Sequence, residues 1–319
     1  MLKPATSSVT GGLVWLALLA LWSSSPPEVR WGMLLLLLAA LVLIPLGLMC
    51  AEGSGHGLWR VATRLQLPAA VLLSISFVPA QGWLAAGLAL PWLLVTLLIA
   101  LAGARRIWQR GLAKIEENCV DAGLIFLAVG GVWAVLARFG ARPLRFDPVI
   151  VLLTAIHFHY AGFVLPLLTG LAGRRLKGGL NRLAATGVMA GVPLTALGIT
   201  ATQSGFTHAF ESLAALLTAL AGWLTAVMHF RLAAQSGAAR RVRVLWLVTA
   251  LSLTFGMALA ALYGLRFYIP AAWPDIPWMI ALHGTANALG MGLCGLTGWC
   301  SEVGIRNSEV GIRNSEFGS

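Results

Sequence analysis

Histidines recur inside segments of this chain that are otherwise lipid-soluble. His157 and His159 lie in LTAIHFHYAGFVLPLLTG, residues 153–170, and His283 lies in ALHGTANALGMGLCGLTGW, residues 281–299. An imidazole can take up or release a proton near neutral pH and can also ligate a metal ion. Ionisable side chains at membrane depth cost roughly 2.5 to 3.5 kcal/mol for the charged types, so these histidines are candidates for function.

The helical repeat decides which of these side chains can act together. Residues three or four apart share one face of a helix, so Thr154, His157 and Tyr160 form one polar stripe. His157 and His159 are two residues apart and therefore point about 200° away from each other. One metal ion cannot easily use both imidazoles unless the helix is broken between them.

A second polar stripe is expected around His283. Asn287 follows four residues later and shares its face. The helical rise places His157 about 13 Å and His283 about 9 Å from the outer ends of their helices, in a hydrocarbon core of ~30 Å. The two stripes can therefore face each other, and the Gly- and Ala-rich surroundings of His283 place its helix inside the bundle.

Carboxylates extend the candidate set toward both ends of the bundle. Glu116, Glu117 and Asp121 lie at the predicted inner end of one helix, where the last two share a face. His208 and Glu211 lie three residues apart at the outer start of another helix. Each set also has a structural interpretation, as charges at the water interface or as a helix-start pair. Several histidines at one depth favour a functional cluster more than a single one would.

The elements that position these residues are predicted to be transmembrane helices. The chain has 319 residues, of which 59% are hydrophobic and 10% charged, whereas soluble domains carry about 25% charged residues. Apolar runs such as MLLLLLAALVLIPLGL are close to helix length and lack the alternation of barrel strands. We therefore predict an all-α fold, a polytopic transmembrane helical bundle of about ten spans.

The first predicted span is short and resembles a signal peptide, but no clear small-residue cleavage site follows it, so we expect a retained helix. The ten spans are predicted near residues 10–22, 31–50, 59–79, 83–103, 114–138, 148–170, 183–201, 208–229, 244–265 and 277–299.

Basic residues predict the orientation of these spans. If the N-terminus is inside and the spans alternate, 17 Lys and Arg residues fall inside and 5 outside. Such a bias is typical of cytoplasmic loops, so we predict that both termini are cytoplasmic and that the chain lies in the bacterial cytoplasmic (inner) membrane. The net charge of +11 is accounted for by these loops. The expected partners are the lipid bilayer and a lipid-soluble or small-molecule substrate, not nucleic acid.

No long polar linker divides the chain, so residues 1–300 are predicted to form a single integral membrane domain. Residues 301–319 repeat the heptapeptide SEVGIRN and are expected to be an unfolded polar tail. The cysteines form no CxxC or CxxCH motif and are expected to be small apolar fillers; they are Cys50, Cys119, Cys294 and Cys300.

Three segments resemble a known family. EENCVDAGLIFLAVGGVWAVLARFG, LTAIHFHYAGFVLPLLTGLAG and HGTANALGMGLCGLTGW are similar to the YndJ-like family of bacterial multi-pass membrane proteins. The resemblance covers residues 114–300 best, and the first four predicted spans match in hydropathy alone. It implies site residues rather than an activity. The residues of this chain that correspond to the acidic, His-Gly and Asn-Ala-Leu-Gly positions of the family pattern are Glu116, Glu117, Asp121, His283, Gly284, Asn287 and Gly290.

Four functions are compatible with this pattern. The first is a membrane-embedded acid–base enzyme acting on a lipid or isoprenoid-like substrate, because His, Tyr, Asn and carboxylate groups suit proton transfer. The second is a multi-pass transporter of a small solute, with or without proton coupling. The third is a redox protein in which either His157 or His159 ligates a haem together with His283, or all three histidines hold a metal ion. The fourth is a structural subunit whose polar groups hold helices together. The enzyme is preferred narrowly, and the sequence names neither substrate nor cofactor.

In the enzyme hypothesis, His157 or His283 serves as acid or base, and an inner carboxylate donates a proton or stabilises charge. We expect alanine variants of the three membrane histidines to fold and insert but to lose function. The expected catalytic residues are His157, His159, His283, Asp121, Glu117, Tyr160 and Asn287, and the expected substrate-binding residues are Glu116, Thr154, Glu211 and His208.

Overall fold

The structure is a computed structural model that describes residues 4–22, 27–51, 57–269 and 273–304. Within these ranges the chain forms helices joined by turns, with no strand. The predicted all-α class is therefore confirmed.

Ten helical rods make up the described chain, and three of them contain π-helical turns. The rods without a π-turn are α1 (Pro4–Leu21), α4 (Gly57–Ile75), α5 (Trp83–Arg110), α6 (Ile115–Phe139), α9 (Gly179–Gln203), α10 (His208–Ala234) and α11 (Arg240–Gly264). Three rods contain π-turns. The first consists of α2 (Pro27–Leu38), η1 (Ala39–Leu43) and α3 (Ile44–Cys50), and the second of α7 (Pro148–His159), η3 (Tyr160–Val164) and α8 (Leu165–Arg175). The third consists of α12 (Ile276–Trp278), η4 (Met279–Gly284) and η5 (Ala286–Cys294). We call this third one, which continues to Gly304, the last rod.

Eight of the rods are long and apolar enough to cross a membrane. The shorter α1 and the helix α4, which carries Arg60 and Arg64, are not among these eight. The ten rods lie where the ten segments were predicted. The chain is therefore a multi-pass membrane protein, and the number of about ten spans is approximate.

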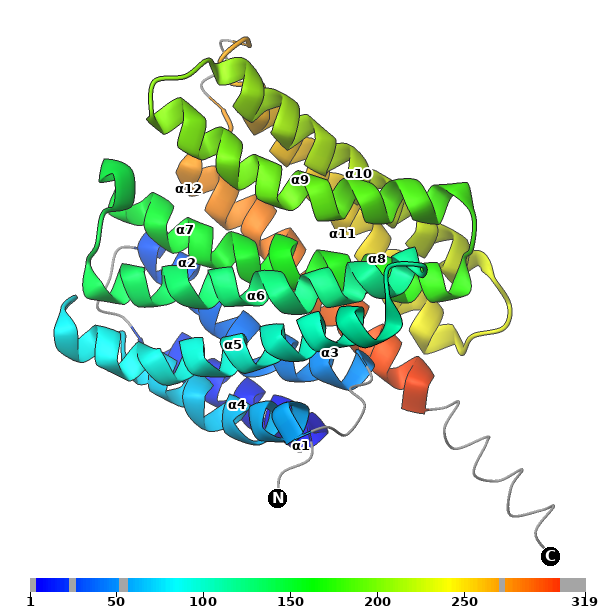
Figure 1. Ribbon diagram of the computed structural model, residues 1–319, viewed down its shortest axis with the longest axis horizontal. Helices are drawn as coiled ribbons and strands as arrows, with labels where there is room; N and C mark the ends of the chain where they lie inside the picture. Colours follow the sequence, from blue (N-terminus) through cyan, green and yellow to red (C-terminus); the bar gives the residue numbers. More distant parts are fainter. Residues whose placement is uncertain (1–3, 23–26, 52–56, 270–272, 305–319) are drawn as a thin grey trace, which may run out of the picture.

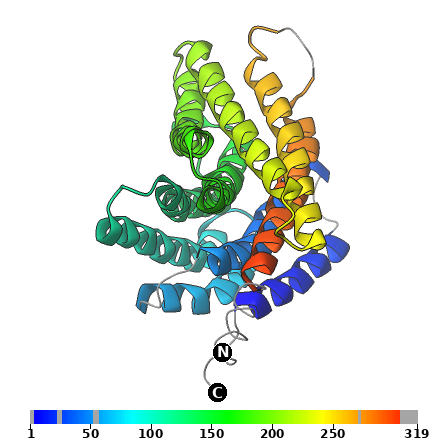
Figure 2. The ribbon, with the colours of Figure 1, turned by 90° about the vertical axis from the view of Figure 1, so that its right-hand side faces the viewer.

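The ends of the rods gather at two opposite faces of the bundle (Figure 1). One face carries the loops 111–114 and 176–178, and we call it the inner face because the predicted orientation puts it in the cytoplasm. The opposite, outer face carries the loops 140–147 and 204–207. Helices α1, α4 and α5 lie on one side of the bundle and α9, α10 and α11 on the other (Figure 1). The last rod, orange to red, returns between them and packs against α2 and η1 (Figure 2).

The two rods that carry the membrane histidines begin in the same way at the outer face. An Oδ1 atom of Asp147 accepts a hydrogen bond from Val149 N at 2.9 Å, and that of Asp275 accepts one from Trp278 N at 3.0 Å. A proline follows within the first helical turn of each, where its missing N–H is not needed. These caps set where each rod begins and hence how deep its histidines lie.

Close backbone contact joins α9 to α10. A Cβ atom on Gly198 would lie 2.7 Å from Glu211 Cα, and one on Gly191 would lie 3.0 Å from Thr218 Cα. Small residues allow this approach between membrane helices. As a result Glu211, although it lies in the first turn of α10, is buried against α9.

Candidate functional site: a chamber between the histidine helices

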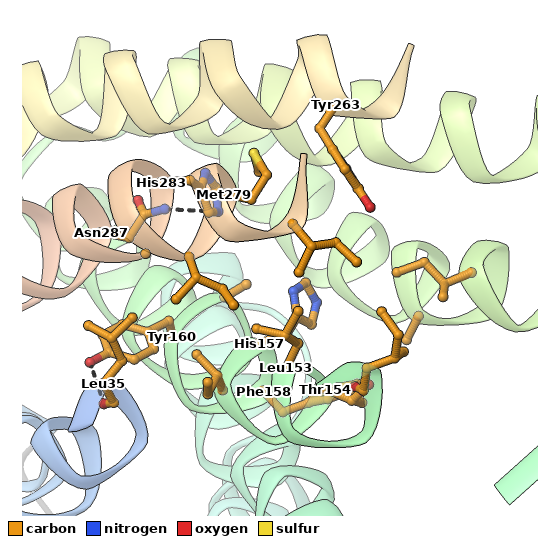
Figure 3. Close-up of a pocket in the computed structure, with 18 of the residues that line it drawn as sticks. Leu35, Leu153, Thr154, His157, Phe158, Tyr160, Tyr263, Met279, His283 and Asn287 are labelled. Carbon is orange, nitrogen blue, oxygen red and sulfur yellow. Dashed lines mark hydrogen bonds between the residues drawn. The ribbon is translucent and has the colours of Figure 1, made fainter. Parts of the chain in front are cut away.

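A cavity of about 370 Å³ lies between the rods that carry His157 and His283. Helices α2, α6, α7, α9, α10, α11 and the last rod contribute to its walls, most of which are apolar. We call it the chamber. Both imidazoles face this space from different rods (Figure 3). The polar side chains of the lining are Thr154, His157, Tyr160, Thr200, Glu211, Tyr263, Arg266, His283 and Asn287.

Irregular helical turns form part of the chamber wall. Tyr160 begins η3, His283 lies in η4 and Asn287 lies in η5. A π-turn accommodates one more residue than a regular α-helical turn, and such turns recur at functional sites. The chamber therefore lies where two of its helices depart from regular geometry.

His283 is held by two hydrogen bonds. Its Nδ1 atom lies 2.8 Å from the carbonyl oxygen of Gly256, which can only accept, so Nδ1 carries a proton. Its Nε2 atom then accepts from Nδ2 of Asn287 at 3.1 Å, as the dashed line in Figure 3 marks. This assignment follows from the hydrogen-bond network. It leaves Oδ1 of Asn287 buried and without a partner in the described part of the chain.

His157 has one unused ring nitrogen. Its Nε2 atom is buried and has no hydrogen-bond partner among the described residues. The ring also makes a hydrogen bond with the backbone of Val192 in α9. Because the N–H groups of a helix interior are used within the helix, the ring donates to the carbonyl there. The imidazole of His157 therefore contacts α9 while it lines the chamber.

Three hydroxyl groups of the lining already donate to backbone carbonyls. The Tyr160 hydroxyl bonds the carbonyl oxygen of Leu35 at 2.8 Å and so ties η3 to α2. Thr154 and Thr200 each bond the carbonyl four residues earlier in their own helix, also at 2.8 Å. The predicted stripe of Thr154, His157 and Tyr160 does face the chamber, but its hydroxyl donors are occupied.

An ion pair lies at the outer end of the chamber. Nη2 of Arg266 is 2.6 Å from Oε1 of Glu211, whose side chain is 5% exposed. The guanidinium lies over the rings of Tyr263 and Phe267, 4.2 and 4.0 Å from their centroids. His208 stacks on Phe267 at 3.9 Å and does not line the chamber. Glu211 thus pairs with Arg266 rather than with His208.

His159 points away from the chamber. Its Nε2 atom accepts a hydrogen bond from Trp92 Nε1 at 3.0 Å, and its Nδ1 atom lies 2.7 Å from the carbonyl oxygen of Ala155. The side chain is fully buried between α7 and α5. Helical geometry predicted its opposite direction from His157, and the structure places it outside the site.

The carboxylates of α6 lie at the inner face, away from the chamber. Asp121, which is fully buried, lies 2.6 Å from Nε of Arg106 and 2.8 Å from Nη1 of Arg110. Glu117 accepts from Nε and Nη2 of Arg174 at 2.7 and 2.9 Å. We call this group the inner-face cluster; it ties α5 and α8 to α6. None of its members lines the chamber.

Two further ion pairs flank the inner-face cluster. Glu116 pairs with Lys177, and Glu302 accepts from Nη1 of Arg175 at 2.9 Å. Glu302 belongs to the segment 301–319 that was assigned to an unfolded tail, but residues 301–304 continue the last rod. The remainder of that segment lies outside the described residues.

Three polar residues of the chamber were not predicted from the sequence: Thr200, Tyr263 and Arg266. Tyr263 and Arg266 lie three residues apart at the outer end of α11. Arg266 was predicted to lie in an outer loop. Residues three apart share one face of a helix, and this spacing of Tyr263 and Arg266 is the sequence signal that could have identified them. The π-turns had no recognisable signal.

The three-histidine metal site, one alternative of the redox hypothesis, is not assembled in the described chain. His157 and His283 share the chamber, whereas both ring nitrogens of His159 are occupied elsewhere. In the described ranges no three His, Cys, Asp or Glu side chains are grouped so as to hold a metal ion.

The fold and the site define a polytopic helical membrane protein with a mainly apolar chamber that two histidines face. A family model described as YndJ-like protein matches residues 34–291. The chain therefore belongs to the YndJ-like family. The match spans the whole chamber lining, which runs from Leu35 to Met291.

The chain is also similar to a curated protein, the "Uncharacterized membrane protein YndJ" of Bacillus subtilis (strain 168). The two are 33% identical over 221 residues, which cover 68% of this chain and 38% of the relative. The chain thus spans well under half of the length of that relative. No solved structure matches this chain.

Proposed function

We propose that the chain is a membrane-embedded acid–base enzyme that binds a lipid-soluble substrate in the chamber. His157 is the general base, and the His283–Asn287 pair orients the substrate and shares its proton. The observation that carries this proposal is a mainly apolar cavity that is lined by two histidines, His157 and His283, from different rods.

The composition of the chamber supports this proposal. Sites for small molecules are concave and mainly apolar, with a few convergent polar groups. A general base must lie within hydrogen-bond reach of the proton it removes. The imidazole of His157 lines the cavity, and the bonds of His283 to Gly256 and Asn287 fix its ring. The cavity thus brings the His157 imidazole close to a second, positioned imidazole.

The proposal gives no catalytic role to the residues that the structure places elsewhere. Asp121, Glu117 and Glu116 are engaged in ion pairs at the inner face, and His159 is bonded to Trp92. We propose structural roles for these four. Glu211 remains at the outer end of the chamber, paired with Arg266.

The test is turnover of a membrane lipid extract by the purified protein, followed by mass spectrometry. We expect the wild-type protein to consume a compound that accumulates in cells lacking it. His157→Ala and His283→Ala should slow this turnover by about 100-fold or more, the usual contribution of a positioned acid or base. His208→Ala is the matched control, because His208 lies outside the lining. Unchanged turnover in both chamber variants would sink the proposal.

A transporter is the second candidate. It is favoured by the π-turns η3, η4 and η5, because transporters bind their substrates beside interrupted membrane helices. The same extract separates the two functions. An enzyme changes the mass of a compound in detergent solution, whereas a transporter changes only its distribution across the membrane of proteoliposomes.

A further inference from the structure

We propose that Cys50 and Cys300 are a pair of thiols that a small disulfide oxidises to a reversible disulfide bond, which fastens the last rod to α3 at the inner face. Neither residue lines the chamber, so this site of oxidative modification is independent of the proposed function. The inference follows from the contact between the two thiols, from their different exposure and from the way in which the end of α3 is held.

The two thiols are far apart in the sequence and meet where the last rod passes α3. Cys50 is the final residue of α3, and its Sγ atom lies 2.7 Å from Sγ of Cys300 near the red end of the last rod (Figure 1). Both cysteines are reduced in the structure. The bond of a disulfide is about 2.05 Å long, so the two sulfur atoms need to approach by less than about 1 Å.

The backbone around the contact shows that both side chains point into the same crossing of the two rods. Sγ of Cys300 lies 3.3 Å from the carbonyl oxygen of Leu46, and Sγ of Cys50 lies 3.9 Å from that of Leu296. Each of these carbonyl groups belongs to the residue four positions before the opposite cysteine. The arrangement is therefore reciprocal, with one thiol supplied by each rod.

The end of α3 is held in place by the inner-face cluster. Nη1 of Arg106 donates to the carbonyl oxygen of Ala51 at 2.7 Å, and Nη1 of Arg174 donates to that of Cys50 at 3.4 Å. Both arginines also pair with Glu117 of α6. Cys50 is thus positioned relative to α6, and a disulfide bond at Cys50 connects the last rod to the inner-face cluster.

The two thiols differ in exposure, and this difference sets the order in which they react. Cys50 is buried, with 1% of its surface exposed, whereas Cys300 is partly exposed. An oxidant from solution therefore reaches Cys300 first, and Cys50 is the resolving thiol. Cysteines that sense oxidants commonly combine an accessible thiol with a resolving one in this way.

The oxidant is a low-molecular-weight disulfide, and the reaction is thiol–disulfide exchange. The thiolate of Cys300 attacks one sulfur atom of the oxidant, so that a mixed disulfide forms and the S–S bond of the oxidant breaks. The first small thiol leaves with the proton that Cys300 has lost. The sulfur of Cys50 then attacks that of Cys300, and the second small thiol leaves with the proton of Cys50. Two protein thiols are oxidised to one disulfide, while the oxidant is reduced to two small thiols.

The predicted cytoplasmic position of the pair sets its resting state. Small thiols keep cytosolic cysteines reduced, and the disulfides that do form there are usually transient. The pair therefore stays reduced until small disulfides accumulate. The rod of Cys50 contributes Leu35 to the chamber and the rod of Cys300 contributes His283, so the bond fastens two walls of the chamber at their inner ends.

The experiment treats the full-length protein in detergent with oxidised glutathione and identifies linked peptides by mass spectrometry. We expect a peptide pair that joins Cys50 to Cys300 and the loss of two of the four thiols, both reversed by dithiothreitol. In SDS, which unfolds the protein, the same linkage should form at least about ten-fold more slowly, because an unfolded loop of this length rarely closes. This comparison uses the wild-type protein and does not depend on any variant folding.

Variants then test the order of attack. Cys50→Ser should retain glutathione on Cys300, because no resolving thiol remains, whereas Cys300→Ser should gain no adduct at the buried Cys50. Cys294 is a partly exposed cysteine of the same rod, so Cys294→Ser is the matched control and should form the linkage as the wild type does. Oxidation should raise the midpoint of thermal unfolding by about 5 °C in the wild type and leave that of Cys300→Ser unchanged.

The outcomes decide between a reactive pair and a mere contact. A glutathione adduct that persists on wild-type Cys300 without any linkage to Cys50, or linkage of either residue to Cys119 or Cys294, would overturn the pairing. Equal rates in detergent and SDS would overturn it as well, because the contact in the folded protein would then have no effect. An adduct on Cys50 in Cys300→Ser would overturn the order of attack, and an unchanged midpoint after linkage would overturn the fastening of the last rod.

Discussion

At the scale of single residues, two histidines two positions apart have different environments. His157 lines a cavity and has one buried ring nitrogen without a partner in the described chain, and His159 has both ring nitrogens bonded in a packed interior. The expectation that alanine variants of both would leave the fold intact therefore needs revision for His159, because Trp92 Nε1 would lose its acceptor.

We predict that His159→Leu lowers the thermal stability of the protein and that His157→Leu does not. Leaving the buried Trp92 N–H without a partner costs about 1–3 kcal/mol, whereas replacing the His157 imidazole by an apolar group removes its buried, unsatisfied Nε2 atom. The measurement is the midpoint of thermal unfolding in detergent, followed by size-exclusion chromatography. Equal midpoints for the two variants would contradict the structural role of His159.

The helical period was enough to predict which way these side chains point, but not what they meet. The opposite directions of His157 and His159 follow from the α-helical repeat alone. Their partners Val192 and Trp92 lie on α9 and α5, and only the packing of distant helices brings them together. The same limit applies to Asp121, whose depth resembled that of a site residue until its arginine partners were located.

At the scale of elements, the boundaries of the helices were easier to predict than their irregularities. Asp147 with Pro148, and Asp275 with Pro277, start two rods close to the predicted positions 148 and 277. The π-turns depend on how neighbouring helices pack, so local sequence carried no sign of them. Both predicted stripes nevertheless line the chamber.

Helix α1 offers a controlled test of element packing, because two adjacent glycines have different surroundings. A Cβ atom on Gly11 would overlap the carbonyl oxygen of Leu41 in η1 and would lie 2.8 Å from the carbonyl carbon, whereas one on Gly12 would meet nothing within 4 Å. We predict that Gly11→Ala destabilises the protein by about 1–3 kcal/mol, the usual cost of overpacking.

Gly12→Ala should change stability by less than about 0.5 kcal/mol. Thermal unfolding in the same detergent compares the two. If Gly12→Ala proved the more damaging, α1 would not pack on η1 in this way.

At the scale of the whole molecule, the arrangement of charge predicts how the bundle lies in the membrane. The inner-face cluster collects Arg106, Arg110 and Arg174 at the ends of α5 and α8. Buried charges of this kind need their partners, so the cluster also fixes three helices relative to one another at the predicted cytoplasmic face.

Two exposed serines test this orientation. Ser204 lies in the loop between α9 and α10 at the outer face, and Ser236 lies in the loop between α10 and α11 at the inner face. In a background whose four native cysteines are replaced by alanine, a membrane-impermeant maleimide should label Ser204→Cys in cells with a permeable outer envelope.

Ser236→Cys should be labelled only after the inner membrane is opened. The reverse pattern would invert the topology, and labelling of both positions in closed cells would show that α10 does not cross the membrane.

The π-turns also have a genetic consequence. Each amounts to one residue inserted into an α-helix, so deleting a single codon within Tyr160–Val164 would restore a regular helix. Residues on either side would then rotate by about 100° relative to each other. Either His157 would leave the chamber, or Arg174 would leave Glu117. In an alignment of the family, members that lack one residue at this turn would therefore lack the chamber, even if they retain every histidine.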